Sequence, residues 1–463
     1  MPKRDFVLAY SGRIWHNNGS GAFRGAASFP RVPPNHAVWL AGGAEEGSGK
    51  QDMKLEELKG KTVGVCVSGG LDSKTICCVL LDAGVKVKAF SANVGQPDEK
   101  DINDIKTRMA PTGVDTTIVD VTKEMADICF ETVKCQAMYD GGYWNSTGIA
   151  RAVTVKALLP AMKKAGCVAL VHGATGRGND QMRFERYTNV LDPKFGVYAP
   201  WRDADLLKKF PGRTQMVEFL AKRGIVAFVG TKKKYSTDAN LAGLSHEAED
   251  LESMETSMRI VKPTMGVWPE KAPNKVEKVT LSFVKGRCVA VNGKKMTPYE
   301  VMLEMNKVGG RNGIGMKHAL ENRIIGTKSR GVYEAPGMEV LSWGLKYIYE
   351  GVMDRRSTLL FQQLSKLVAD QIYDGRWYDP ATQAARAAIQ VWADKATADV
   401  TLGLYKGNIF FESLKGLKAT IYNEADSSME ASNGLNPHSS QGFAEIQSVE
   451  AKMLAKAGQI VVK

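Results

Sequence analysis

The first half of the chain alternates short apolar runs with segments of helical period. Runs of strand length, rich in β-branched residues, lie at 62–67, 86–92, 116–121 and 167–172. Segments with helical spacing of apolar residues lie between them, near 73–83, 123–134 and 149–165. This alternation predicts βαβ units and a parallel sheet. Ligands of open α/β sheets bind beyond the carboxyl ends of the strands, so we expect the loops after Val67, Ala92 and His172 to converge.

The pattern changes near residue 275. Strand-like runs at 279–283 and 288–291, separated by Lys285-Gly286, predict antiparallel hairpins. Further on come helix-period stretches at 298–308, 337–350, 357–373 and 382–396, strand-like runs at 400–404 and 409–411, and a short helix at 443–456. We therefore predict an α/β protein with a parallel-sheet domain, a second α+β domain and a C-terminal arm. The predicted bounds are 1–52 for an N-terminal extension, 53–222, 223–424 and 425–463.

Residues 1–52 have no hydrophobic periodicity. Up to Ala44 they contain five Lys or Arg and one acid, Asp5, in a Gly, Ser and Pro-rich context. We predict a disordered extension or an upstream start codon, with Met53 as the functional start. An acid-poor segment containing arginine also loosely resembles an organellar transit peptide, which is the minor alternative.

Composition narrows the class of protein. With 463 residues, 44% of them hydrophobic and 24% charged, the chain is long enough for two globular domains. No run of 18 apolar residues occurs, so we expect no membrane span. The net charge of +12 is spread along the chain and does not form one basic arm, which favours a solvated surface over a nucleic-acid partner.

The cysteines and histidines indicate a compartment and argue against a metal site. There are seven cysteines, an odd number, and no C-x-x-C pair occurs, which suits a reducing cytoplasm. The six histidines make no metal-ligand spacing with cysteine. We therefore predict a cytoplasmic protein without a structural zinc site, and we name no metal-ligating residue.

The segment Val63–Thr75, VGVCVSGGLDSKT, is the strongest chemical signal. It reads as a buried strand, a Ser68-Gly69-Gly70 turn and a helix that begins near Asp72. Glycines allow an anion close to the backbone, and the first N–H groups of a helix have no intrahelical partner. The spacing fits neither G-x-x-x-x-G-K-[ST] nor G-x-G-x-x-G. It resembles the SGGxDS loop of ATP pyrophosphatases, while the plain alternative is a strand-to-helix connection with Asp72 or Ser73 as a cap.

Two further clusters concentrate polar groups. The loop after the fourth run, HGATGRGNDQMRFER at 172–186, places the amide of Asn179, the carboxylate of Asp180 and the guanidinium of Arg183 within about one turn. The segment 235–247 gathers hydroxyls and acids with little apolar content. Each cluster alone also fits an ordinary turn with capping residues.

Five motifs together resemble the argininosuccinate synthase family, particularly its longer bacterial form. They are SGGLDS, SANVGQPDE at 91–99, HGATGRGNDQMRFE at 172–185, YSTDANLAGLSHEAEDLE at 235–252 and ENRIIGTKSRGVYEAPG at 321–337. The resemblance runs in order from about Lys61 to Leu414 and weakens in the C-terminal arm. It implies an adenine-nucleotide α-hydrolase-like (PP-loop) domain, a synthetase domain and an oligomerisation arm.

The resemblance also implies a reaction. ATP would activate L-citrulline as a citrullyl-AMP, and L-aspartate would displace AMP to give argininosuccinate in arginine biosynthesis, the chemistry used in the urea cycle. Mg²⁺ would accompany the phosphates, and the protein would be a homotetramer. Such a ligase depends on positioning and charge neutralisation more than on a nucleophilic side chain.

Site residues follow by position from the resemblance. ATP would contact Cys66, Val67, Ser68, Gly69, Gly70, Leu71, Asp72, Ser73, Lys74, Ala92, Gly173, Thr175, Asp180 and Asp238. Aspartate would contact Thr175, Asn179 and Asp180, of which Asn179 and Asp180 also bridge to the other substrates. Citrulline would contact Tyr143, Arg183, Ser236, Ser245, Glu247, Glu321 and Tyr333. The candidate catalytic residues are Asp180, Asp72 and Ser68.

Some of these positions also have simpler interpretations. Taken alone, Glu321 fits a surface helix salt bridge and Tyr333 a packed aromatic residue. Ser73 and Lys74 stand where the family usually has Thr-Ser, and Lys74 places a cation in the first helical turn, where the helix dipole opposes it. A few residues are also missing before Tyr143 relative to the family.

Three other functions stay open at this point. A paralogue that ligates another ureido or amino acid would keep every motif. A tRNA-modifying ATP pyrophosphatase would suit the positive charge, but sulfur-transfer members need a paired catalytic cysteine, and Cys77-Cys78 within a helix is a poor candidate. A non-catalytic binding protein would be expected to lose the phosphate loop or Asp180, and the chain has both.

Overall fold

The computed structural model describes residues 53–226, 235–430 and 433–460 of the chain. The predicted N-terminal extension, residues 1–52, lies outside the described residues. No helix in these three ranges is long and apolar enough to cross a membrane.

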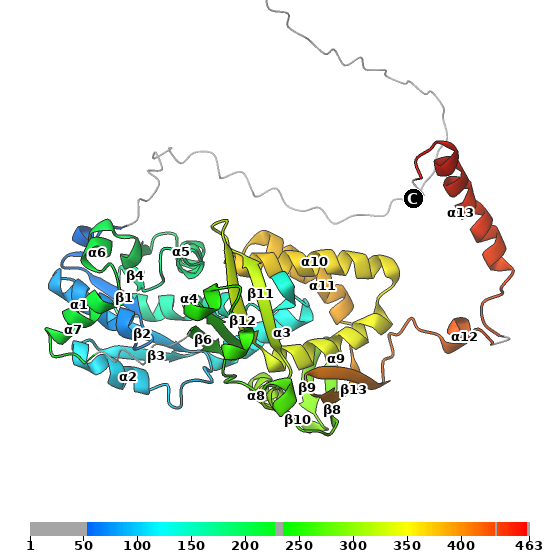
Figure 1. The fold of residues 1–463 in the computed structure, drawn as a ribbon, viewed down its shortest axis with the longest axis horizontal. Helices are drawn as coiled ribbons and strands as arrows, with labels where there is room; N and C mark the ends of the chain where they lie inside the picture. The colour runs from blue at the N-terminus through cyan, green and yellow to red at the C-terminus, as the bar shows by residue number, and fades with distance from the viewer. Residues whose placement is uncertain (1–52, 227–234, 431–432, 461–463) are drawn as a thin grey trace, which may run out of the picture. The chain divides into compact units, whose positions relative to one another are not determined.

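A five-stranded parallel sheet, in the order β3-β2-β1-β4-β5, forms the first part of the fold (Figure 1). Its strands are β1 (Thr62–Cys66), β2 (Lys86–Asn93), β3 (Thr116–Asp120), β4 (Ala169–His172) and β5 (Gly196–Tyr198). Its helices are α1 (Leu71–Asp82), α2 (Asp104–Met109), α3 (Thr122–Lys134), α4 (Ser146–Lys164), α5 (Asp180–Leu191), α6 (Ala204–Lys209) and α7 (Arg213–Ala221). The predicted parallel sheet is confirmed. The strand order reverses between β1 and β4, the point at which a ligand crevice is expected.

Side-chain alternation along β1 explains how both faces of this sheet are covered. Val63 and Val65 pack with Ile76 of α1 in one apolar cluster. Gly64 points to the opposite face, where a Cβ would lie 2.6 Å from Cγ of Met162 in α4. Since successive strand residues face opposite sides, glycine at this position lets α4 lie close to the sheet.

Two antiparallel sheets form the second part. The four-stranded sheet β11-β12-β7-β6 consists of β6 (Ser236–Asn240), β7 (Gly243–Glu247), β11 (Met316–Asn322) and β12 (Lys328–Glu334). The five-stranded sheet β10-β9-β8-β13-β14 consists of β8 (Glu277–Val284), β9 (Arg287–Val291), β10 (Lys294–Lys295), β13 (Ala398–Tyr405) and β14 (Asn408–Lys415). Figure 1 draws the four-stranded sheet between the parallel sheet and the helices that follow it. The prediction of an α+β second part is confirmed.

The helices of the second part begin where their sequences provide caps. They are α8 (Pro298–Arg311), α9 (Pro336–Val352), α10 (Arg355–Tyr373), α11 (Pro380–Ala393), α12 (Glu424–Ser427) and α13 (Ser439–Lys456). Thr297 and Glu300 form a reciprocal capping box at the start of α8. Asp354 accepts hydrogen bonds from two N–H groups at the start of α10. No residue of α13 is buried.

Hydrophobic periodicity does not predict the four strands β6, β7, β11 and β12. In these strands polar residues occur at successive positions, and therefore on both faces of the sheet, for example in Ser236-Thr-Asp-Ala-Asn240. The alternation is lost because both faces carry polar residues: one face lines a polar cavity, and on the other face buried His246 pairs with Glu334 at 2.7 Å.

One apolar cluster crosses from the parallel sheet into the second part. It includes Phe90 of β2, Met125 of α3, Leu281 of β8, Met305 of α8 and Leu345 of α9. The two parts of the described chain thus share a core, which holds the strand ends of the parallel sheet near the four-stranded sheet.

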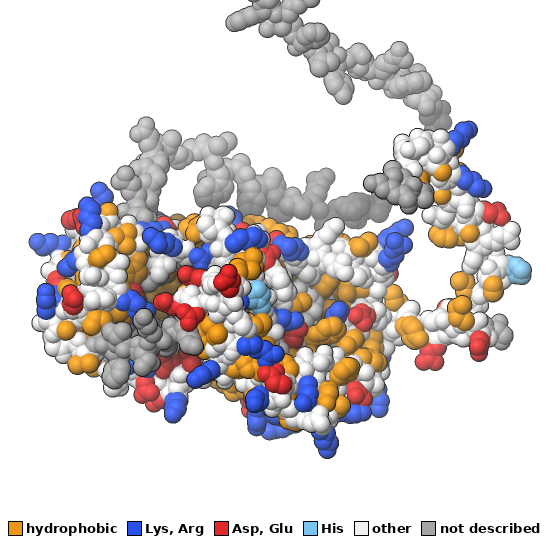
Figure 2. Space-filling view, viewed as in Figure 1, with side chains coloured by type: hydrophobic (Ala, Val, Ile, Leu, Met, Phe, Trp, Pro, Cys, Tyr) orange, Lys and Arg blue, Asp and Glu red, His pale blue; other side chains and the backbone are white. Residues whose placement is uncertain are grey.

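On the face drawn in Figure 2, Lys and Arg side chains are scattered among acidic and apolar ones.

Candidate active site

The loop between β1 and α1 has the geometry of an anion-binding turn. Gly69 has a φ of +77°, a conformation that favours glycine. The N–H of Ser68 donates to the hydroxyl of Ser73 at 3.0 Å, which closes the loop. The first intrahelical bond of α1 runs from the N–H of Lys74 to the carbonyl of Gly70, so the N–H groups before it are available to a ligand.

A guanidinium group holds this loop from outside the motif. Arg108 of α2 donates to the two carboxylate oxygens of Glu99 at 2.5 and 3.1 Å and to the Ser68 carbonyl at 3.2 Å. A Cβ on Gly69 would lie 2.7 Å from Nε of Arg108. The glycine therefore serves both the turn and the close approach of Arg108.

Most of the predicted ATP residues line one cavity. A cavity of about 410 Å³, which we call the ATP cavity after its predicted ligand, opens at the carboxyl ends of β1, β2 and β4. The predicted residues that line it are Cys66, Val67, Ser68, Asp72, Ser73, Ala92, Gly173, Asp180 and Asp238. Four others, Gly69, Gly70, Leu71 and Lys74, are not among its lining residues. Thr175 lines the neighbouring cavity instead.

Every residue predicted for aspartate or citrulline lines a second cavity, of about 330 Å³, which we call the amino-acid cavity. They are Tyr143, Thr175, Asn179, Asp180, Arg183, Ser236, Ser245, Glu247, Glu321 and Tyr333. The two cavities share Gly173, Ala174, Asp180, Thr237 and Asp238. Two separate recognition regions therefore meet at Asp180 and Asp238.

Asp180 lies between two arginines at this junction. Arg151 of α4 donates to it from Nη2 at 2.8 Å and from Nε at 3.1 Å, and Arg183 donates at 3.0 Å. Arg151 also pairs with Asp238 of β6. Burial raises the pKa of Asp180, but the two guanidinium groups outweigh it and hold the pKa below its ordinary value. Burial, with the Asp180 carboxylate nearby, holds the pKa of Asp238 above its ordinary value.

Arg183 is buried and already has two partners. Its Nη1 donates to Asp180, and its Nε donates to the Tyr373 carbonyl at 2.9 Å. Its guanidinium carbon also lies 5.1 Å from the centre of the Tyr373 ring. The guanidinium is therefore held in one orientation at the wall of the cavity.

Three tyrosine hydroxyls surround Glu321. Tyr333 donates to one carboxylate oxygen at 3.0 Å, and Tyr143 donates to the same oxygen. Tyr373 donates to the other oxygen at 2.8 Å. Glu321 lies on β11 with 4% of its surface exposed, so the interpretation of a surface helix salt bridge is wrong. Tyr333 is indeed packed, stacked on Tyr143 at 3.8 Å between ring centres, yet it also lines the cavity.

Glu247, at the end of β7, is the other carboxylate of this cavity. Burial, reinforced by the nearby Glu321 carboxylate, raises the pKa of Glu247 to about 7. A buried acid with such a pKa changes its charge near neutral pH. A cationic group of a ligand would favour its charged form.

Comparisons with known proteins identify the family. The family model described as the arginosuccinate synthase N-terminal HUP domain matches residues 62–226, and the model described as the arginosuccinate synthase C-terminal domain matches residues 235–454. The chain is also similar to argininosuccinate synthase from Rhodopirellula baltica. The two are 37% identical over 396 residues, which cover 85% of this chain and 98% of the relative.

The chain belongs to the argininosuccinate synthase family. The resemblance read from the motifs is confirmed, and so is the fold class. The parallel sheet corresponds to the HUP domain, and the antiparallel sheets lie in the C-terminal domain.

Sequence reasoning missed three residues that support the candidate site: Arg108, Arg151 and Tyr373. Arg151 lies in a segment predicted as a core helix, and a charged residue among buried neighbours such as Ala150 and Ala152 was the available signal. Tyr373 is the last residue of α10, and Arg108 lies in the short helix α2. No local pattern marks either of them, because their roles depend on segments far away in the chain.

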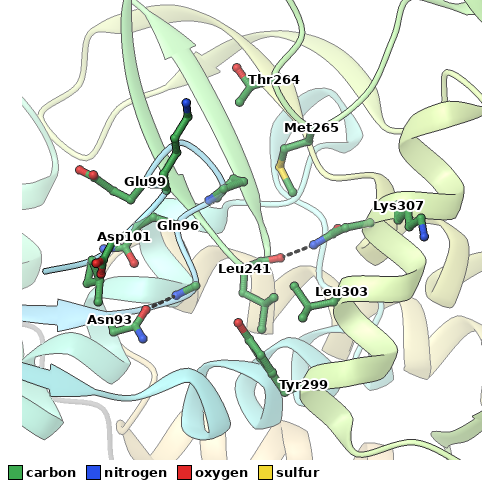
Figure 3. A pocket seen from close by; sticks show the side chains of 15 residues that line it. Asn93, Gln96, Glu99, Asp101, Leu241, Thr264, Met265, Tyr299, Leu303 and Lys307 are labelled. Carbon is green, nitrogen blue, oxygen red and sulfur yellow. Dashed lines mark hydrogen bonds between the residues drawn. The ribbon is translucent and has the colours of Figure 1, made fainter. Parts of the chain in front are cut away.

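A third cavity, of about 540 Å³, adjoins the ATP cavity (Figure 3). No residue predicted from the resemblance lines it. Gln96 and Glu99 line both this cavity and the ATP cavity, so the motif at 91–99 forms a wall between them. Figure 3 shows Tyr299 and Leu303 of α8 among its lining residues.

Proposed function

We propose that this protein is an AMP-forming carbon–nitrogen ligase that joins L-citrulline to L-aspartate, with ATP converted to AMP and pyrophosphate, in arginine biosynthesis. Family membership supports this function. The observation that carries it is the meeting of two cavities at Asp180. One follows the phosphate loop, and the other combines the guanidinium of Arg183 with the carboxylates of Glu247 and Glu321.

The reaction has two steps. The ureido oxygen of citrulline attacks the α-phosphorus of ATP, and pyrophosphate leaves, which gives citrullyl-AMP. The amine of aspartate then attacks the ureido carbon, AMP leaves with the oxygen, and the amine gives up a proton. Asp180 is held ionised by two arginines, so it orients the reacting groups as a fixed charge and is a poor proton acceptor near neutral pH.

Complementary charges hold citrulline in this proposal. Arg183 takes its α-carboxylate, since a guanidinium matches a carboxylate in shape and charge. Glu247 and Glu321 take its α-ammonium group, and Ser236 and Ser245 line the same cavity. Thr175 and Asn179, with Asp180, hold aspartate in the same cavity.

Mg²⁺ fits as a companion of the phosphates. Among residues 53–226, 235–430 and 433–460, no group of three or more His, Cys, Asp or Glu side chains could hold a metal ion. Mg²⁺ commonly needs only one or two carboxylates beside the phosphate oxygens and water. Asp72 and Asp238 line the ATP cavity, and burial raises the pKa of both. They would hold the ion, which would neutralise phosphate charge.

The tRNA-modifying alternative lacks a suitable thiol. Cys77 and Cys78 are buried in α1, and burial raises the pKa of Cys77 to about 12. Such a thiol is almost entirely protonated at neutral pH and is a weak nucleophile. The paralogue that acts on another ureido or amino acid therefore stays the main alternative.

We also propose a cytoplasmic homotetramer whose C-terminal arm contacts neighbouring subunits. Free thiols at all seven cysteines suit a reducing compartment. Along α13, four exposed apolar residues recur at near-helical spacing: Phe443, Ile446, Val449 and Met453. Light scattering of the full chain and of a chain ending at residue 424 tests this proposal, with a smaller oligomer expected after truncation.

One assay tests the function. Pyrophosphate release from ATP is measured with citrulline and aspartate together and with each omitted in turn. Release that needs both amino acids, with argininosuccinate formed in equal amount, is the expected result. If another ureido or amino acid gives a higher kcat/KM than citrulline or aspartate, the paralogue is correct. Release without either amino acid would overturn both.

A further inference from the structure

Tyr373 contacts three residues of the amino-acid cavity at once. It is the last residue of α10, lines that cavity and lies outside every motif of the family resemblance. Its hydroxyl is 2.8 Å from Nδ2 of Asn179 and 2.8 Å from Oε1 of Glu321. Its carbonyl oxygen accepts from Nε of Arg183 at 2.9 Å.

The chemistry of these groups sets the direction of the hydrogen bonds. A phenol has one O–H, and a carboxylate only accepts, so the hydroxyl of Tyr373 donates to Glu321. The same hydroxyl oxygen then accepts from the amide of Asn179. On its other side, Oδ1 of Asn179 accepts from the N–H of Ile324 at 3.2 Å. The amide of Asn179 is therefore held in one orientation by two partners from the second part of the chain.

The ring of Tyr373 is fixed independently of its hydroxyl. It stacks on Tyr139 with ring centres 3.8 Å apart and an angle of 13° between the planes. The guanidinium carbon of Arg183 lies 5.1 Å from the centre of the same ring. Removal of the hydroxyl alone should therefore leave the position of the ring unchanged.

We propose that Tyr373 is a positioning residue that couples the citrulline side of the cavity to the aspartate side. This inference rests on the proposed function, in which Glu321 and Arg183 hold citrulline and Asn179 holds aspartate. The hydrogen-bonded path from Asn179 through Tyr373 to Glu321 orients an amide and a carboxylate together. Loss of the central hydroxyl removes one hydrogen bond from each of them, although neither is changed itself.

The first test is Tyr373→Phe, which keeps the ring and removes the hydroxyl. The KM values for citrulline and for aspartate should each rise about tenfold, as expected from loss of hydrogen bonds to charged or buried polar groups. The KM for ATP should change less than twofold, because Tyr373 does not line the ATP cavity.

Tyr349→Phe is the matched control. The hydroxyl of Tyr349 is also buried and donates to a carbonyl oxygen, that of Lys134, at 3.0 Å, but Tyr349 lines neither cavity. This variant should lose a similar amount of thermal stability and keep all three KM values. If both variants change the three KM values alike, the role of Tyr373 is structural and the proposal is wrong.

A second variant changes the acceptor of the Tyr373 hydroxyl and does not depend on how Tyr373→Phe folds. In Glu321→Gln the hydroxyl of Tyr373 faces a weaker, neutral acceptor. The coupling predicts a severalfold rise in the KM for aspartate, which Glu321 does not contact in the proposed function. A rise for citrulline alone would overturn the coupling. Absence of citrulline-dependent turnover in the wild-type protein would instead overturn the proposed function.

Discussion

The two ends of the active site are built in different ways. The nucleotide end centres on nine consecutive residues, Cys66–Lys74, whose backbone forms the anion-binding turn between β1 and α1. The amino-acid end uses side chains from α4–α5, the four-stranded sheet and α10, which lie far apart in the sequence. A backbone turn is specified by neighbouring residues, whereas a side-chain site exists only after distant elements have packed.

This difference predicts different responses to mutation. At the nucleotide end, a side chain that disturbs the backbone should matter most, because backbone groups form the anion-binding turn. At the amino-acid end, changes that keep the backbone but alter one charge or one hydroxyl should be sufficient. Asp180 belongs to both ends, so it should be the most sensitive position.

Asp180→Ala should nearly abolish turnover. The substitution removes the carboxylate shared by the two cavities and leaves Arg151 and Arg183 without their common partner. Loss of a charge that orients reacting groups costs on the order of 10²-fold or more in kcat. Steady-state kinetics measure this loss, and Asp192→Asn, which alters a salt bridge with the exposed Lys163, should be nearly neutral. Activity within a few-fold of wild type would remove Asp180 from the mechanism.

Gly69→Ala should damage the nucleotide end alone. A side chain at a φ of +77° costs about 1–2 kcal/mol, and the added Cβ would lie 2.7 Å from Nε of Arg108. We expect the KM for ATP to rise roughly tenfold or more, since 1.4 kcal/mol corresponds to a factor of ten. Gly70→Ala is the control, because its Cβ would meet only Oγ of Ser68 at 3.6 Å and its φ is −81°. Equal effects of the two substitutions would show that the geometry at Gly69 is not what matters.

Arg183→Lys should damage mainly the amino-acid end. Lysine cannot keep the bonds to Asp180 and the Tyr373 carbonyl and at the same time offer a fork to a carboxylate. The KM for citrulline should rise roughly tenfold, as expected from loss of a charge-assisted bond of about 1.5–3 kcal/mol. The KM for ATP should change little. A lower ATP affinity with unchanged citrulline affinity would assign Arg183 to the phosphates.

Citrulline binding should weaken as the pH falls through about 7. The pKa of Glu247 is raised to about 7, so its carboxylate is charged above that pH and becomes neutral below it. Only the charged form attracts the ammonium group of citrulline, and the KM for citrulline should therefore rise severalfold between pH 8 and pH 6. In Glu247→Gln this dependence should disappear, with a high KM at every pH. A flat profile in the wild-type protein would argue against contact between Glu247 and the ammonium group.

Removal of residues 1–52 should have the smallest effect. These residues contain no site motif and no periodic apolar pattern, and the family match begins at residue 62. The shortened protein should melt within a few degrees of the full chain and keep its kcat and KM values, as measured by calorimetry and steady-state assays. Loss of folded, active protein would show that the extension stabilises the rest of the chain.

Local sequence was a good guide wherever one element carried its own signal. The four apolar runs of the parallel sheet differ from β1–β4 by no more than two residues at either end. The phosphate loop could be read from Ser68-Gly-Gly-Leu-Asp72, because glycine conformations and free helix N–H groups are properties of neighbouring residues. The strands β6, β7, β11 and β12 escaped detection, since polar residues on both faces of their sheet remove the usual alternation.

By itself, then, the sequence determined the parallel sheet, the phosphate loop and, through five motifs, the family of this protein. Only the tertiary structure decided that Arg151 joins Asp180 to Asp238, that Arg108 supports the loop and that Tyr373 reaches Asn179 and Glu321. The physical reason is the distance along the sequence over which each feature is determined. Backbone conformation depends on adjacent residues, but the partner of a buried charge or hydroxyl depends on which distant elements pack against it.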